Sequence, residues 1–171
     1  DHPVVFVTWS TKPDHQLDGF APRLQTTLRW TAEGSDLRND LLIFMVSYAT
    51  DRAYRGVGDV PPLGIRMMAS LELALSSGEL RLTSRDSDQQ PSLDYRYFEA
   101  EEDLRRMREA VRQCVSLGDH EQFHDIIESR LEPTDEELSS DDNLNTYMTR
   151  EVTTGQHISG TCKMGPDTDD M

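Results

Sequence analysis

The feature that most constrains the fold of this chain is a change in the spacing of its apolar residues near Pro91. Before this point, short stretches are rich in β-branched and aromatic residues or alternate between apolar and polar positions, which favours β-strands. These stretches cover residues 3–11, 24–32, 40–49, 65–75 and 78–84. After it, apolar residues recur with the period of an amphipathic helix. The expected helices cover residues 99–117, 120–131 and 141–151.

Strands followed by helices predict an α+β fold. We expect one largely antiparallel sheet with the helices packed on one face. The turn-forming residues 76–78 predict a hairpin that joins 65–75 to 78–84. On the helix over 99–117, Cys114 falls on the apolar face and is expected in the core, and Gly118 is the expected stop.

Composition and charge exclude several classes of function. The chain has 171 residues, enough for one domain, and a formal net charge of −15. That charge argues against binding to nucleic acid or to anionic membrane surfaces. The longest nearly apolar run, residues 41–49, is too short to span a bilayer, and no secretory signal is visible. Two cysteines without a CxxC spacing predict a reduced, cytoplasmic protein.

An HExxH pattern is formed by His120, Glu121 and His124. On a helix it would place two imidazoles one turn apart, able to share a zinc ion, with the glutamate as general base. Here the pattern occupies the first turn of the expected helix, directly after Asp119, and no convincing third ligand follows. We interpret the two histidines as exposed residues at a helix start, and a zinc hydrolase remains the less favoured alternative.

The stretch GQHISGTCKMG, residues 155–165, is the best candidate for a functional loop. Gly155 and Gly160 let the backbone turn sharply and approach a ligand. Thr161 and the loop amides offer hydrogen bonds. Histidine titrates near neutral pH, as a base for an alcohol proton should, so His157 is a candidate base. The alternative is a turn with a surface histidine.

Three segments resemble one known family. HISGTCKMG, residues 157–165, closely resembles the HxxGTCxMG segment of the glucose–methanol–choline (GMC) family of FAD-dependent oxidoreductases. GELRLTSRDSDQQPSLDYRYF, residues 78–98, resembles the family's GxVxLxSxDPxxxPxIxxxY stretch, and DHP at residues 1–3 resembles the end of its NLxDHP segment. The overall pattern is most similar to the choline-dehydrogenase-like and mycofactocin-associated branches. Gln156, Ile158 and Ser87 depart from the usual family residues.

The resemblance implies a specific role for the histidine loop. His157 would take the hydroxyl proton of a small-molecule alcohol while the carbinol carbon passes a hydride to flavin N5. The backbone of Gly160, Thr161 and Cys162 would approach the isoalloxazine. Residues 1–154 would form the substrate-binding domain. Residues 155–171 would form the active-site histidine loop, leading back to the FAD domain of the same polypeptide.

Two parts of the family pattern are absent from the sequence. The FAD-binding GxGxxG is missing, since Gly56-Val57-Gly58 does not match it, and so is the second active-site His or Asn. The resemblance therefore implies a truncated part of a longer enzyme. We expect the isolated chain to be inactive, to hold no FAD and to self-associate through exposed apolar surface. A non-catalytic binding domain of the same fold is the alternative.

Overall fold

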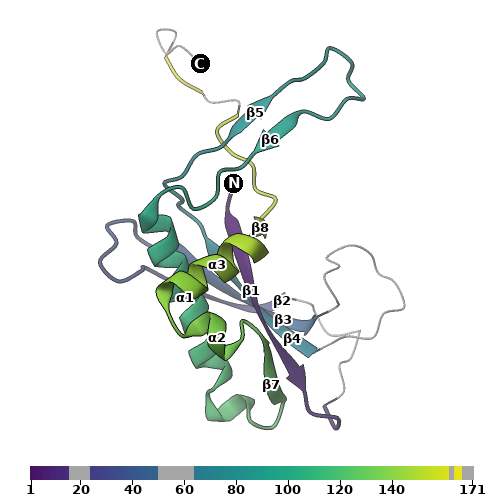
Figure 1. Ribbon diagram of the computed structural model, residues 1–171, viewed down its shortest axis with the longest axis vertical. Helices are drawn as coiled ribbons and strands as arrows, with labels where there is room; N and C mark the ends of the chain where they lie inside the picture. The colour runs from purple at the N-terminus through teal and green to yellow at the C-terminus, as the bar shows by residue number, and fades with distance from the viewer. Residues whose placement is uncertain (16–23, 50–63, 162–163, 167–171) are drawn as a thin grey trace.

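The computed structural model describes residues 1–15, 24–49, 64–161 and 164–166 and has the predicted α+β architecture. A mostly antiparallel sheet is covered by helices on one face (Figure 1). The strand order is β2 (Leu24–Trp30), β3 (Leu41–Ala49), β4 (Gly64–Leu71), β1 (Pro3–Thr11) and β7 (Ile127–Glu132). The short strand β8 (Thr153–Thr154) pairs with the first residues of β1. The strands over 3–11, 24–32 and 40–49 are thereby confirmed, with ends that differ by at most two residues.

The core lies between the sheet and two helices, α1 (Glu101–Gly118) and α3 (Asp141–Glu151). Alternate residues of each central strand face this layer, as the two-residue period of a strand requires. They include Val5, Val7, Trp9, Ile65, Met67, Ala69 and Leu71. Cys114 of α1 is fully buried, as predicted, and burial raises the pKa of its thiol. From α3, the buried Tyr147 donates its hydroxyl proton to the carbonyl of Phe6 at 2.7 Å.

The remaining helical segments are short. The 3-10 helix η1 covers Glu121–Phe123, and α2 covers Asp135–Leu138. Helix α2 begins at a capping box in which Thr134 and Glu137 satisfy each other's backbone amides. A bilayer crossing requires a long apolar helix, and the described part of the chain contains none.

The helix predicted over 120–131 is wrong. This segment forms η1 and then strand β7, which pairs with the end of β1, where Trp9 lies opposite Arg130 and Thr11 opposite Ile127. Without β7, the edge of β1 there would lack a partner for its backbone groups. The need to pair this edge outweighs the helix-like spacing of the segment. The HExxH pattern therefore does not lie on an α-helix.

The predicted hairpin between 65–75 and 78–84 is also wrong. Both edges of β4 are already occupied, one by β3 and the other by β1. Strand β5 (Glu79–Arg81) pairs instead with the downstream β6 (Ser92–Asp94) in a separate two-stranded sheet. This β5–β6 hairpin extends away from the main sheet and helices (Figure 1).

Gly118 is still helical, so its predicted role as the residue after the helix is wrong; the helix ends at the cap residue Asp119. The glycine is needed for packing instead. A Cβ at this position would lie 2.4 Å from Cζ2 of the buried Trp9 ring. The absence of a side chain therefore lets α1 approach β1 closely.

A buried ion cluster joins α1 to two loops. The guanidinium of Arg106 donates to Asp40 Oδ2 at 2.9 Å, to Asp103 Oδ1 at 2.6 Å and to the Leu73 carbonyl at 2.9 Å. The side chains of Arg106, Asp40 and Asp103 are at most 1% exposed. Burial alone would raise the pKa of Asp40, but hydrogen bonds from the Ala32 amide and Arg106 outweigh it and lower that pKa.

We predict that Arg106→Met lowers the free energy of unfolding by about 3–5 kcal/mol, because it leaves two buried carboxylates without their cation. Arg105→Met is the matched control. Arg105 is 35% exposed and pairs with Glu102, which is 40% exposed, so its loss should cost less than about 1 kcal/mol. Urea denaturation of both variants checks the difference, and equal costs would contradict it.

The lowered pKa of Asp40 predicts a pH dependence of stability. A carboxyl group whose pKa is lower in the folded state stabilises the fold above its unfolded value, about 3.9. That contribution is lost as the pH falls through the folded pKa. The difference in unfolding free energy between wild type and Asp40→Asn should therefore be largest near neutral pH and shrink below about pH 4. Urea titrations across this range measure it, and a constant difference would refute the prediction.

Candidate active site

The histidine loop starts beside the first residues of the chain. Strand β8 pairs with β1 so that Thr154 lies opposite Pro3. Directly after it, the amide of Gly155 donates to the carbonyl of His2 at 2.8 Å. This pairing brings Gly155 and His157 next to Asp1 and His2, although more than 150 positions separate them in sequence.

The carboxylate of Asp1 connects three segments. Oδ1 accepts the amide proton of His157 at 3.0 Å. Oδ2 accepts from the hydroxyl of Tyr97 at 2.8 Å and from that of Thr154. Burial raises the pKa of the Tyr97 phenol, so this donor stays protonated. One acidic group thus holds together the β1 start, the segment after β6 and the histidine loop.

The imidazole of His2 lies between His157 and Glu72. The rings of His2 and His157 meet edge to face, with centroids 5.2 Å apart and planes at 83°. Nε2 of His2 lies 3.4 Å from Oε2 of Glu72. The other oxygen of Glu72 accepts from the Ser70 hydroxyl at 2.7 Å, which orients the carboxylate. Two imidazoles and one carboxylate therefore stand in a row beside the loop.

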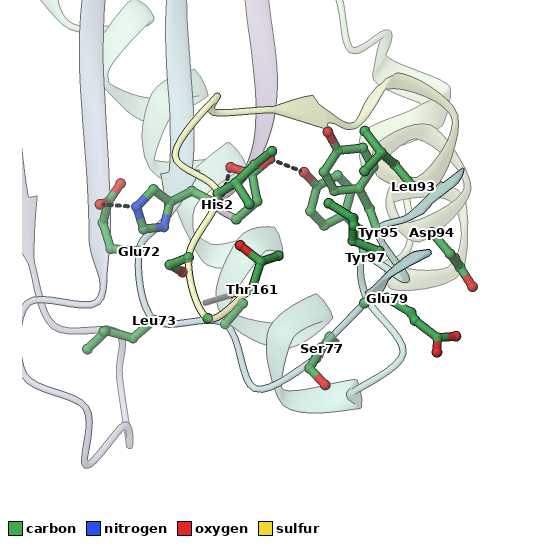
Figure 2. Close-up of a pocket in the computed structure, with 18 residues that line it drawn as sticks. His2, Glu72, Leu73, Ser77, Glu79, Leu93, Asp94, Tyr95, Tyr97 and Thr161 are labelled. Atoms are coloured by element: carbon green, nitrogen blue, oxygen red, sulfur yellow. Dashed lines mark hydrogen bonds and ion pairs between the residues drawn. The ribbon is translucent and has the colours of Figure 1, made fainter. Parts of the chain in front are cut away.

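A pocket of about 640 Å³ opens next to this row. Figure 2 shows His2 pointing toward Glu72 on one side of the pocket, with Leu93, Tyr95 and Tyr97 on the other. The rings of Tyr95 and Tyr97 are stacked, with centroids 5.0 Å apart. The lining comes from four segments, residues 1–2, 72–80, 93–97 and 158–161. A volume of this size is typical of sites for small molecules and cofactors.

The β5–β6 hairpin forms one wall of the pocket. Its two strands meet closely at Gly78, where a Cβ would lie 2.1 Å from the carbonyl oxygen of Asp94. Arg96 closes the base of the hairpin by ion pairs with Asp94 at 2.8 Å and Glu79 at 3.6 Å. Large apolar side chains remain exposed on the hairpin and the histidine loop, namely Leu80, Leu82, Leu93, Ile158 and Met164.

Three of the four site residues predicted from sequence fall among the described residues. Gly160 and Thr161 line the pocket. His157 does not line it but is exposed at its edge, in ring contact with the lining residue His2. Gly160 has a φ of +83°, and a Cβ there would meet no atom within 4 Å, so the backbone faces open space. Cys162 lies outside the described residues.

Sequence reasoning did not assign a role to several residues of this site. Asp1 and His2 belong to the DHP segment, which served only as part of a family resemblance. Tyr97 falls on the last tyrosine of the family stretch that residues 78–98 resemble, but no contact is predicted for it from the sequence. Glu72 has no motif around it, so no sequence signal identifies it.

The HExxH residues lie elsewhere in the molecule. His120 and His124 flank the 3-10 helix and are exposed, and Nδ1 of His120 accepts the amide proton of Gln122. Within the described ranges, no group of three His, Cys, Asp or Glu side chains is arranged to hold a metal ion. The described structure therefore gives the zinc hydrolase alternative no support.

The sequence matches one family model and several curated proteins. A family model described as GMC oxidoreductase matches residues 74–171, more than half of the chain. The oxygen-dependent choline dehydrogenase of Rhizobium johnstonii is 27% identical over 119 residues, which are 70% of this chain and 22% of that protein. The enzyme of the same name from Escherichia coli is 29% identical over 114 residues, 67% of this chain and 20% of that protein.

Solved structures share the fold. Pyridoxine 4-oxidase from Mesorbium loti matches 98% of this chain and 33% of its own, with a TM-score of 0.76 and 16% identity. Formate oxidase matches 91% of this chain and 35% of its own, with a TM-score of 0.70 and 17% identity. A variant of the Aspergillus oryzae formate oxidase, studied for its FAD modification, gives a TM-score of 0.67 at 18% identity over the same shares of the two chains. The present chain spans about a fifth of the curated relatives and about a third of the solved chains.

We predict that Gly78→Ala loosens the β5–β6 hairpin and the pocket wall. The added methyl group would overlap the carbonyl of Asp94, and crowding of this kind costs about 1–3 kcal/mol. Hydrogen exchange of the amides in 79–94 should accelerate, while exchange in β3 and β4 stays unchanged. The exposed neighbour Ser77 supplies the control, Ser77→Ala, for which no change is expected. Unaltered exchange in Gly78→Ala would contradict the close approach.

Proposed function

This chain belongs to the GMC oxidoreductase family, and we propose that it forms the substrate-binding and catalytic-base part of an FAD-dependent alcohol oxidoreductase. The family membership confirms the resemblance seen in the sequence. The single observation that carries the proposal is the fixed position of the His157 loop, whose next four residues line the pocket.

The described residues fit a planar, aromatic cofactor. Leu80, Leu93 and Ile158 supply apolar contacts to the pocket, and Tyr95 and Tyr97 supply aromatic ones. The backbone at Gly160 faces open space, so a ligand can approach it closely. Gly160 and Thr161 would hold the flavin ring of FAD, which when bound supplies the hydride acceptor.

His157 would act as the general base. Oxidation of an alcohol requires removal of the hydroxyl proton as the carbinol carbon loses its hydride, and histidine is the side chain that most often serves this purpose. Its amide is held by Asp1 and its ring by the edge contact with His2. The ring is exposed at the pocket edge, where a substrate hydroxyl can reach it.

We propose a small-molecule alcohol as the substrate. Choline and pyridoxine, the compounds in the names of two relatives, both carry hydroxyl groups. The pocket volume of about 640 Å³ suits molecules of this size.

The FAD domain of the same polypeptide is the proposed partner of the exposed apolar surface. Leu82 is 80% exposed and Met164 96% exposed, and both belong to the segments that flank the pocket. The relatives are several times longer than this chain, so each has further protein to cover such a surface. In the isolated chain, the same surface would favour self-association.

We predict that His157→Ala, made in the complete polypeptide, slows anaerobic flavin reduction by about 10²-fold or more, because a positioned base contributes about 10²–10⁴-fold. FAD should remain bound. Stopped-flow absorbance of the flavin measures the rate. His124→Ala is the control, since His124 is exposed and does not line the pocket, and its rate should stay within a few-fold of wild type. Reduction of the His157 variant at the wild-type rate would rule out His157 as the base. Either another residue would then be the base, or the domain would have a non-catalytic binding role.

A further inference from the structure

The turn that carries His157 is tied to one carboxylate. The amide of His157 donates directly to Asp1 Oδ1 at 3.0 Å. The preceding amide, of Gln156, donates at 2.9 Å to the hydroxyl of Thr154, and that hydroxyl donates to Asp1 Oδ2. Two consecutive amides are therefore held by Asp1, one directly and one through a single hydroxyl.

The backbone of this turn needs such support. Gln156 has a φ of +63°, in the left-handed region that costs a residue with a side chain about 1–2 kcal/mol. Conformations of this kind persist where surrounding contacts hold them in place. The hydrogen bonds to the amides of Gln156 and His157 provide that restraint. Without Asp1, Gln156 is free to return to ordinary backbone angles, which would redirect the chain at His157.

Ring contacts support the same geometry. The imidazole of His157 meets the ring of His2 edge to face, and His2 is in turn held by Glu72. His2 is the residue after Asp1, and its carbonyl accepts the amide proton of Gly155. The backbone and the ring of His157 are therefore both located by contacts from residues 1 and 2.

We propose that Asp1 is a positioning residue for His157, whose carboxylate fixes the turn that places the imidazole at the pocket edge. This inference rests on the proposed function of His157 as the base. Proton transfer depends on close geometry, and a misplacement of about 1 Å can cost about 10²-fold in rate. Asp1 thus contributes to the reaction through His157.

Asp1→Ala in the complete polypeptide, with FAD bound, is the main test. Alanine has neither acceptor oxygen, so the His157 amide and the hydroxyls of Thr154 and Tyr97 all lose this partner. The limiting rate of flavin reduction should fall about 10-fold or more, while the apparent substrate dissociation constant changes less than about three-fold. Asp141→Ala is the matched control, because Asp141 is an exposed carboxylate on α3 that accepts from Arg112 at 2.6 Å and does not line the pocket. Its limiting rate should stay within about two-fold of wild type.

Hydrogen exchange gives a readout that does not depend on activity. In Asp1→Ala, the amides of residues 155–161 should exchange about 5- to 10-fold faster than in wild type, as expected for the loss of one hydrogen bond of about 1 kcal/mol. Exchange in β3 and β4 should not change. Tyr97→Phe removes one hydrogen bond from the same carboxylate and leaves the bond to His157, so exchange in residues 155–161 should stay at the wild-type rate. If Asp1→Ala does not accumulate as folded protein, Thr154→Val, which removes the hydroxyl link to Gln156, should show the same local acceleration.

These variants distinguish the positioning role of Asp1 from the proposed function of His157. A wild-type rate in Asp1→Ala, together with a slow His157→Ala, would overturn the positioning role but keep the proposed base. Equal slowing in Asp1→Ala and Asp141→Ala, or faster exchange across the whole sheet, would show that the effect of Asp1 is not specific to the histidine turn, and would also overturn the positioning role. A wild-type rate in His157→Ala would remove the proposed function, whereas the local exchange in Asp1→Ala would still decide whether Asp1 anchors the turn.

Discussion

Arg106 is fully buried between Asp40 and Asp103, and the desolvation of these three charges is tolerated only while they stay together. Asp40 lies just before β3, while Asp103 and Arg106 lie on α1, so the cluster fixes the helix against the sheet. Asp103 also accepts the amides of Leu75 at 2.9 Å and Ser76 at 2.7 Å. These bonds turn the chain after β4 outward into the β5–β6 hairpin. The position of one pocket wall therefore depends on an ion cluster in the core.

Much of the fold follows from local patterns in the sequence. The strand over 3–11 and the helix over 141–151 have the predicted bounds, because each has an apolar face of the right period and a clear start. The predictions are wrong where pairing between strands that are distant in sequence determines the secondary structure. No local spacing shows that the end of β1 needs β7 as a partner, or that β3 and β1 already occupy both edges of β4. Spacing alone therefore predicts a helix over 120–131 and a hairpin partner for 65–75 over 78–84, and both predictions are wrong.

The sequence likewise predicts only part of the candidate site. Glycines and a histidine in one short loop make His157 a candidate but are equally compatible with a surface turn, and only the family resemblance predicts roles for His157, Gly160 and Thr161. Their supporting contacts come from residues that are remote in sequence. The hydroxyl of Tyr97 donates to Asp1, which lies 96 positions earlier in the sequence. Glu72, directly after β4, pairs with His2 near the start of β1. Contacts between such distant residues leave no spacing that a single sequence can reveal.

The bond between Asp1 and His157 joins residues 156 positions apart in a sequence of 171 residues. Folding rates fall as the average sequence separation of contacts rises, because long loops lose more entropy on closing. The hairpin and α1 rest on contacts between near neighbours and can form early. The histidine turn, by contrast, can be ordered only after residues at both ends of this span have been synthesised and brought together. During synthesis on the ribosome, the pocket edge would thus be among the last parts of the domain to acquire its final geometry.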